Sequence, residues 1–185
     1  MAKKTILITV LLISFVLGIA HVAHYYPKLP DTVATHFNGA GEADGFSSKQ
    51  THATLMISLQ LGMMALFLGL GWLIRVLPAN LINIPHRDYW LSAERKESTI
   101  AKMFAGMLTM AIGTQWFFIG LDHITTLHNL GSPAMKWFWP IFGIYMSFVI
   151  GFCIWLSIKF RLPADAKDAG GQMLKNNGGQ RTIKT

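Results

Sequence analysis

Four long apolar stretches alternate with shorter polar segments along the chain, at about residues 5–26, 53–77, 100–121 and 137–160. Charged residues occur only toward the ends of these stretches. A bilayer core about 30 Å thick requires roughly 20 apolar residues in a helix, because each backbone N–H and C=O must find its partner within the segment. The pattern predicts an all-α integral membrane protein with four transmembrane helices.

The polar segments between these stretches differ in character. We expect one four-helix transmembrane domain over residues 1–162, with a structured loop at 27–52 that folds back over the helices. In this loop Pro27 and Pro30 stiffen the chain, residues 33–37 alternate as a short strand would, and glycines supply tight turns. Residues 78–99 are predicted to be an interfacial segment with Ser92 as the N-cap of the next helix, and 163–185 have the composition of a flexible tail.

Composition agrees with a membrane location. Of the 185 residues, 52% are hydrophobic and only 14% are charged, against about a quarter charged in soluble domains. The net charge of +7 does not indicate nucleic-acid binding, because the basic residues flank the apolar stretches instead of gathering on a soluble face. No nucleic-acid partner is expected.

The basic residues also predict an orientation. When the four helices are drawn as successive hairpins, 13 of the 16 lysines and arginines fall on one side, and only Lys28, Lys49 and Lys136 fall on the other. Because lysine and arginine are retained in cytoplasmic loops, both termini are expected in the cytoplasm and the 27–52 loop outside. A cleaved secretory signal at the N-terminus is the less favoured alternative, since the first apolar run exceeds the usual length of a signal core.

Small residues recur at helical spacing in three of the stretches. In lipid, helices associate through such residues, which allow close approach, and not through the hydrophobic effect. These tracks are Ala65 and Gly69 in the second stretch, Gly106, Gly113 and Gly120 in the third, and Gly143, Ser147 and Gly151 in the fourth. The uncharged Gln60 and Gln115 predict hydrogen bonds between helices, and an ion pathway is not indicated, because relays usually require ionisable groups at membrane depth.

The 27–52 loop carries the most distinctive pattern of the chain, formed by Pro30, His36, Asn38, Gly41, Asp44, Gly45 and Lys49. It resembles the signature of an uncharacterised bacterial multi-pass membrane protein family, whose module also forms the N-terminal half of SdpI-type immunity proteins. Residues 83–91 are similar to the family's other short motif, with Pro85, Asp88, Tyr89 and Trp90 as its main members. The resemblance spans about residues 1–125.

This resemblance implies a bacterial cytoplasmic (inner) membrane location and an immunity-type role, because SdpI-type proteins protect cells against a secreted killing peptide. Those proteins have additional helices after the module, whereas only one more apolar stretch follows it here. The resemblance assigns no individual role to any of the signature residues in this chain.

A second kind of site is suggested by the histidines, six of which fall at or near the predicted outer surface. The candidate ligands of one ion are His21, His24, His36, Asp122 and His123. Imidazole and carboxylate together are ligands that zinc and copper accept. The competing interpretation is interfacial histidines without a metal, because no metallohydrolase motif such as His-Glu-x-x-His is present.

Three hypotheses of function follow from the sequence. The leading one is a non-catalytic membrane protein whose outer loop recognises, or shields against, something that arrives from outside. The second is metal handling or metal-assisted hydrolysis at the histidine and aspartate residues, and the third is an accessory subunit or assembly factor of a membrane complex. The expected partners are the lipid bilayer and either another membrane protein or a second copy of the chain, and no catalytic residue is assigned.

Overall fold

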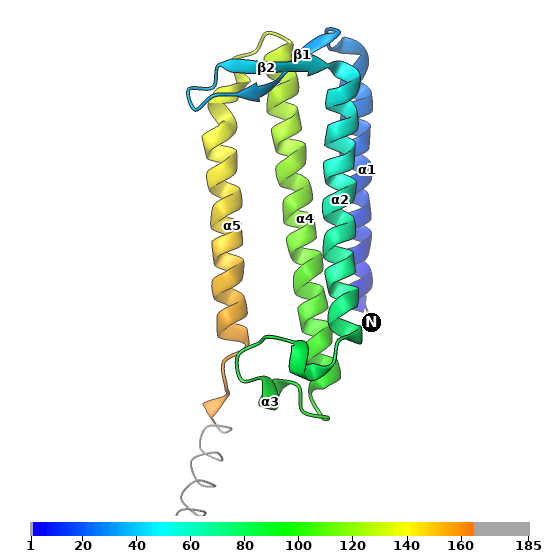
Figure 1. Ribbon diagram of the computed structural model, residues 1–185, viewed down its shortest axis with the longest axis vertical. Coiled ribbons are helices and arrows are strands. Elements are labelled where there is room, and N and C mark those ends of the chain that lie inside the picture. The colour runs from blue at the N-terminus through cyan, green and yellow to red at the C-terminus, as the bar shows by residue number, and fades with distance from the viewer. Residues whose placement is uncertain (1, 165–185) are drawn as a thin grey trace, which may run out of the picture.

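The computed structural model describes residues 2–164, most of which form four long helices that run side by side (Figure 1). These helices are α1 (Ala2–Tyr25), α2 (Lys49–Val76), α4 (Lys96–Asn129) and α5 (Phe138–Lys159). Each is long and apolar enough to cross a membrane. The chain is therefore a multi-pass membrane protein, as predicted. The predicted tail at 163–185 lies outside the described residues from position 165 onward.

Two helices extend beyond the predicted spans, and both extensions carry polar residues. α2 begins at Lys49 and not at 53, because the Ser48 hydroxyl caps the helix by accepting the Thr51 N–H at 3.1 Å. α4 continues to Asn129 and does not end at 121. These extensions place His52 on α2 and Asp122 on α4, at the same end of the bundle.

A β-hairpin covers this end of the bundle. The prediction of an all-α fold is therefore wrong at this point. After a short 3₁₀ helix, η1 (Tyr26–Lys28), strand β1 (Thr32–Phe37) pairs antiparallel with β2 (Ala43–Ser48). Figure 1 shows the hairpin lying across the helix ends, from α2 toward the start of α5. The alternation at 33–37 predicted β1, whereas β2 becomes a strand because β1 pairs with it.

The opposite end of the bundle is closed by the segment between α2 and α4, which contains η2 (Ala79–Leu81) and the short α3 (Arg87–Trp90). The indole N–H of Trp90 donates to the Phe160 carbonyl at 2.9 Å, and the Thr99 hydroxyl donates to the Trp90 carbonyl at 2.8 Å. The segment thereby ties α4 to the end of α5. The prediction of Ser92 as the N-cap is wrong, because α4 begins at Lys96 and Ser92 lies in the preceding turn.

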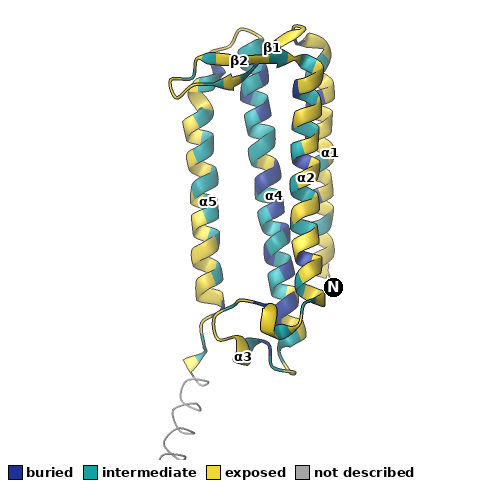
Figure 2. Ribbon diagram, viewed as in Figure 1, coloured by how far each residue is buried: buried dark blue, intermediate teal, exposed yellow. Residues whose placement is uncertain are grey.

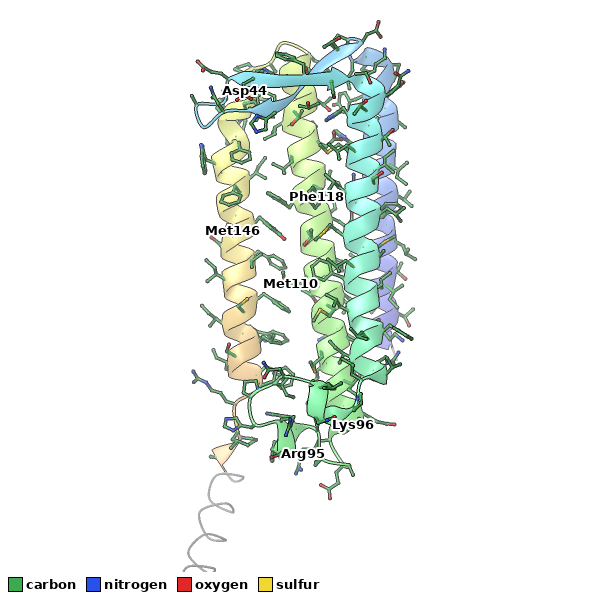
Figure 3. All side chains as sticks on the ribbon, in the orientation of Figure 1. Asp44, Arg95, Lys96, Met110, Phe118 and Met146 are labelled. Carbon is green, nitrogen blue, oxygen red and sulfur yellow. The ribbon has the colours of Figure 1, made fainter. Side chains whose placement is uncertain are left out.

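The core is formed by α1, α2 and α4, with α4 the most buried of the long helices (Figure 2). Leu11 of α1 packs there with Phe104, Leu108 and Ala111 of α4. α5 has no fully buried residue and packs on α4 through aromatic side chains, such as Tyr145 stacked on Phe117 at 4.2 Å between centroids. Figure 3 shows side chains of α4 and α5 filling the space between these two ribbons.

The small-residue tracks have different outcomes. The α4 track packs as predicted, since added side chains at Gly106, Gly113 and Gly120 would meet Phe152, Phe148 and Ile141 of α5. The other two tracks do not pack within the bundle, because the residues of both, Ala65 with Gly69 and Gly143 with Ser147 and Gly151, are exposed. The spacing of small residues indicates a shared helix face but not the direction in which that face points.

Gln115 confirms the prediction of hydrogen bonds between helices. Its Nε2 donates to the Gln60 carbonyl at 2.6 Å, which joins α4 to α2 deep inside the bundle. The Gln60 side chain in turn lies against Gly18 of α1, where an added Cβ would be 1.9 Å from its Oε1. The absence of a side chain at Gly18 thus allows the three core helices to meet here.

Candidate functional site

The hairpin is fixed to the bundle by Asn129, the last residue of α4. Its amide oxygen accepts the Ala34 N–H at 2.7 Å, and its Nδ2 donates to the Ala34 carbonyl at 3.0 Å. Asn129 therefore occupies the edge of β1 as a neighbouring strand would. Val33 and Ala34 are buried against the helices, and the rings of Phe37 and His128 pack edge to face at 4.9 Å between centroids. The hairpin is thus a docked part of the fold.

The signature residues of the hairpin mainly shape the hairpin itself. At its tip, Asn38 accepts the N–H groups of Ala40 and Glu42 on one side-chain oxygen, and Gly41 has a φ of +83°, which favours glycine. Gly45 lies opposite His36, whose Cβ would be 2.8 Å from a Cβ at that position. His36 donates to Asp44 across the strands at 2.5 Å, in an exposed pair.

The remaining signature residues lie at the two ends of the molecule. Lys49 pairs with Asp31 at 3.0 Å at the base of the hairpin, and Pro30 is exposed just before β1. At the opposite end, Pro85 lies in the turn that leads into α3, and Asp88 is almost fully exposed. The guanidinium of Arg95 lies 4.3 Å from the centre of the Tyr89 ring. Together with the Trp90 contact, these positions build the closing segment and form no common site with the hairpin.

A hydrogen-bonded cluster of one carboxylate and three imidazoles lies beneath the hairpin. Asp122 of α4 accepts the Nδ1–H of His21 from α1 at 2.8 Å and the Nε2–H of His52 from α2 at 3.0 Å. With its proton on Nδ1, His21 accepts at Nε2 from His123 Nδ1 at 3.0 Å. One buried carboxylate therefore joins all three core helices.

Of the five predicted metal ligands, the structure brings together three: His21, Asp122 and His123. His24 forms a hydrogen bond with Lys28 at 2.6 Å, and His36 forms one with Asp44, so neither is part of the cluster. No group of three or more potential ligands among residues 2–164 is arranged to hold a metal ion. The predicted five-residue metal site is therefore not assembled, because its members point to different partners.

His52 is the cluster member that the sequence interpretation missed. It is 2% exposed and lies on the extra turn by which α2 exceeds the predicted span. Its Nδ1 has no hydrogen-bond partner, and the residue lines a small cavity of about 10 Å³ together with Asp122, enough for about one water molecule. The signal in the sequence that could have identified His52 was Ser48, because a helix N-cap at Ser48 places residue 52 inside the helix.

A much larger cavity, of about 680 Å³, lies between the hairpin, the end of α4 and the start of α5. We call it the hairpin cavity. Residues 35–41 of the hairpin form one wall; Leu121, Ile124, Thr125 and His128 of α4 form another; Met56 of α2 and residues from 133 to 139 complete it. The lining is mostly apolar, with a few polar side chains from the hairpin, α4 and the 133–137 segment. This composition is typical of small-molecule binding sites.

Comparison with known families and proteins identifies one similar segment. Residues 9–61 match a domain of unknown function, DUF1648. The matched segment takes in most of α1, the whole hairpin and the first part of α2, and therefore includes the hairpin signature and both His21 and His52. Comparisons with curated proteins and with solved structures gave no match. The chain is thus a multi-pass membrane protein that fits an uncharacterised membrane family through its DUF1648 segment.

Proposed function

We propose that this protein is a non-catalytic recognition protein of the bacterial cytoplasmic membrane that binds an amphiphilic ligand in the hairpin cavity. The observation that carries the proposal is the cavity itself. Its volume of about 680 Å³ lies within the range of small-molecule sites, about 300–1,000 Å³. Its lining combines polar side chains, such as Asn38 of the anchored hairpin and His128 of α4, with apolar ones, such as Met56, Leu121 and Phe138.

The distribution of charge supports an orientation in which the hairpin faces outward. The hairpin end carries Lys28, Lys49 and Lys136, whereas the described residues at the opposite end include Lys3, Lys4, Arg75, Arg87, Arg95, Lys96, Lys102, Lys159 and Arg161. Figure 3 labels Arg95 and Lys96 at that end and Asp44 at the hairpin end. Because basic residues are retained on the cytoplasmic side, the hairpin cavity opens toward the exterior in this orientation.

The side chains beside the cavity favour a ligand that lies partly in the membrane. Trp137 and Trp139, at the start of α5, are 55% and 61% exposed. Tryptophan is enriched at the level of the lipid headgroups, so the cavity is expected at the boundary between headgroups and acyl chains. A ligand with its polar head under the hairpin and its apolar part against Leu121 and Met56 matches this position.

The resemblance to SdpI-type immunity proteins motivates a protective form of this recognition. A membrane-active molecule held in the cavity would be withdrawn from the bilayer. Cells that express the chain are then expected to survive a membrane-active killing peptide better than cells without it. Unchanged survival across a panel of such peptides would remove the immunity role but leave ligand binding to be tested directly.

Binding is tested with a dodecyl glycoside that carries a photoactivatable diazirine in its chain, added to the purified protein in nanodiscs. We expect cross-links concentrated on α4 residues 121–128. Phe37→Ser should reduce this labelling several-fold, because Phe37 lines the cavity, whereas Phe46→Ser should not, because Phe46 is 63% exposed on the same hairpin and lies outside the cavity.

Two results would contradict the proposal. Labelling spread evenly over the four helices would show that the cavity is not a preferred site for an alkyl chain. A second membrane protein that copurifies in stoichiometric amount after mild solubilisation, and protects residues 121–128 from the probe, would favour the accessory-subunit hypothesis instead.

A further inference from the structure

Lys136 is the one formally charged side chain that lines the hairpin cavity. The other two lysines of this end have partners, since Lys28 is bonded to His24 at 2.6 Å and Lys49 pairs with Asp31 at 3.0 Å. Lys136 forms no hydrogen bond or ion pair within the part of the chain that the structure describes. It also lines a second cavity, of about 370 Å³, together with residues such as His123, Leu127 and Trp137.

Carboxylates are absent from the lining residues of the hairpin cavity, all of which lie within the described chain. The two acidic residues of the nearby hairpin are held by neighbours: Glu42 accepts from Asn38 at 2.9 Å, and Asp44 accepts from His36. The N-terminal end of α5 beside Lys136 adds further positive potential. Among these lining residues, Lys136 therefore supplies the one formal charge, and that charge is positive.

Resting on the proposed function, we infer that the ligand is an anionic amphiphile whose phosphate head pairs with Lys136 and whose alkyl chain lies against the apolar lining. An unpaired ammonium group at the edge of an apolar cavity is complementary to such a head. Cationic amphiphiles are disfavoured, because their heads would face Lys136 without a carboxylate to pair with them. A zwitterionic head would gain the phosphate contact but leave its own cation unpaired.

Three unlabelled competitors with the same dodecyl chain test this inference: dodecyl phosphate, dodecylphosphocholine and dodecyltrimethylammonium. Each competes with the diazirine glycoside for cross-linking to residues 121–128, below its critical micelle concentration and in nanodiscs of zwitterionic lipid. We expect dodecyl phosphate to compete about fivefold better than dodecylphosphocholine, because both phosphates can pair with the exposed Lys136 but only dodecylphosphocholine leaves a cation unpaired. The trimethylammonium compound should compete least.

The variants separate a local contact from a general effect of charge. Lys136→Met should reduce the advantage of dodecyl phosphate to less than twofold, whereas Lys136→Arg should retain it. Lys28→Met is the matched control, because it removes the same charge from the same end of the bundle but does not line the cavity.

The outcomes distinguish the inference from the proposed function. Equal competition by all three compounds, with labelling still confined to residues 121–128, would overturn the anionic preference and leave the cavity as a binding site. An advantage of dodecyl phosphate that persists in Lys136→Met would also overturn the inference. Labelling outside the cavity would overturn both.

Discussion

Asp122 and His52 face one another in the interior of the bundle, with His52 Nε2 donating to Asp122 Oδ1 at 3.0 Å and each side chain only 3% exposed. The second carboxylate oxygen of Asp122 accepts from His21. A buried carboxylate is costly unless its oxygens are hydrogen bonded. The two imidazoles supply these bonds, and as a result the hairpin ends of α1, α2 and α4 are joined at a single residue.

Replacement of this carboxylate should therefore destabilise the core. In Asp122→Asn, one side-chain oxygen remains as an acceptor and an NH2 group faces an imidazole N–H, so one histidine loses this bond or must move its proton to the other ring nitrogen. We expect a loss of about 2–3 kcal/mol in unfolding free energy, measured by thermal denaturation in mild detergent. Asp88→Asn, at a side chain that is 97% exposed, is the control and should have no effect. Equal stability of the two variants would show that the cluster contributes little.

Asn129→Ala should detach the hairpin from α4. The substitution leaves both the N–H and the carbonyl of Ala34 without their side-chain partner. Because Ala34 is only 4% exposed, water cannot readily replace that partner. Hydrogen exchange at Ala34 should then accelerate by about one to two orders of magnitude, as expected for the loss of about 1–3 kcal/mol. The exposed Asn83→Ala serves as control. Unchanged exchange would mean that other contacts dock the hairpin.

The two glycines Gly45 and Gly39 should respond differently to substitution by alanine. A Cβ at Gly45 would lie 2.8 Å from the Cβ of His36, whereas a Cβ at Gly39 would have no atom within 4 Å. We expect Gly45→Ala to destabilise the hairpin by about 1–2 kcal/mol through overpacking, with faster hydrogen exchange in β1 and β2. Gly39→Ala should behave as the wild type, and a hairpin equally stable in both variants would contradict the predicted clash.

The orientation of the protein can be determined with two matched cysteines in a Cys153→Ser background. Ala40 at the hairpin tip and Ala93 at the opposite end are both exposed alanines. In intact cells, a membrane-impermeant maleimide should label Ala40→Cys and not Ala93→Cys, which should react only after the cells are opened. The reverse pattern would place the hairpin in the cytoplasm and remove the basis for recognition from outside.

The amino-acid sequence by itself determined the elements that depend on local pattern. Four apolar runs predicted four helices of membrane length, because a segment in lipid must satisfy its own backbone, and α1, α2, α4 and α5 follow these runs. The alternation at 33–37 likewise predicted β1. Lys28, Lys49 and Lys136 were correctly grouped at one end, since consecutive spans of this length must alternate in direction.

Only the tertiary structure decided which side chains meet, because contacts between distant residues depend on the rotation of each helix and on the exact extent of its ends. Spacing alone could not show that Gly113 faces α5 whereas Gly143 faces away from the bundle. The sequence suggested His24 and His36 as partners of Asp122, but these two bond to Lys28 and Asp44 instead. The longer α2 brings His52 to Asp122. The hairpin cavity, formed by segments up to about 100 residues apart, arises only when all of these contacts are made together.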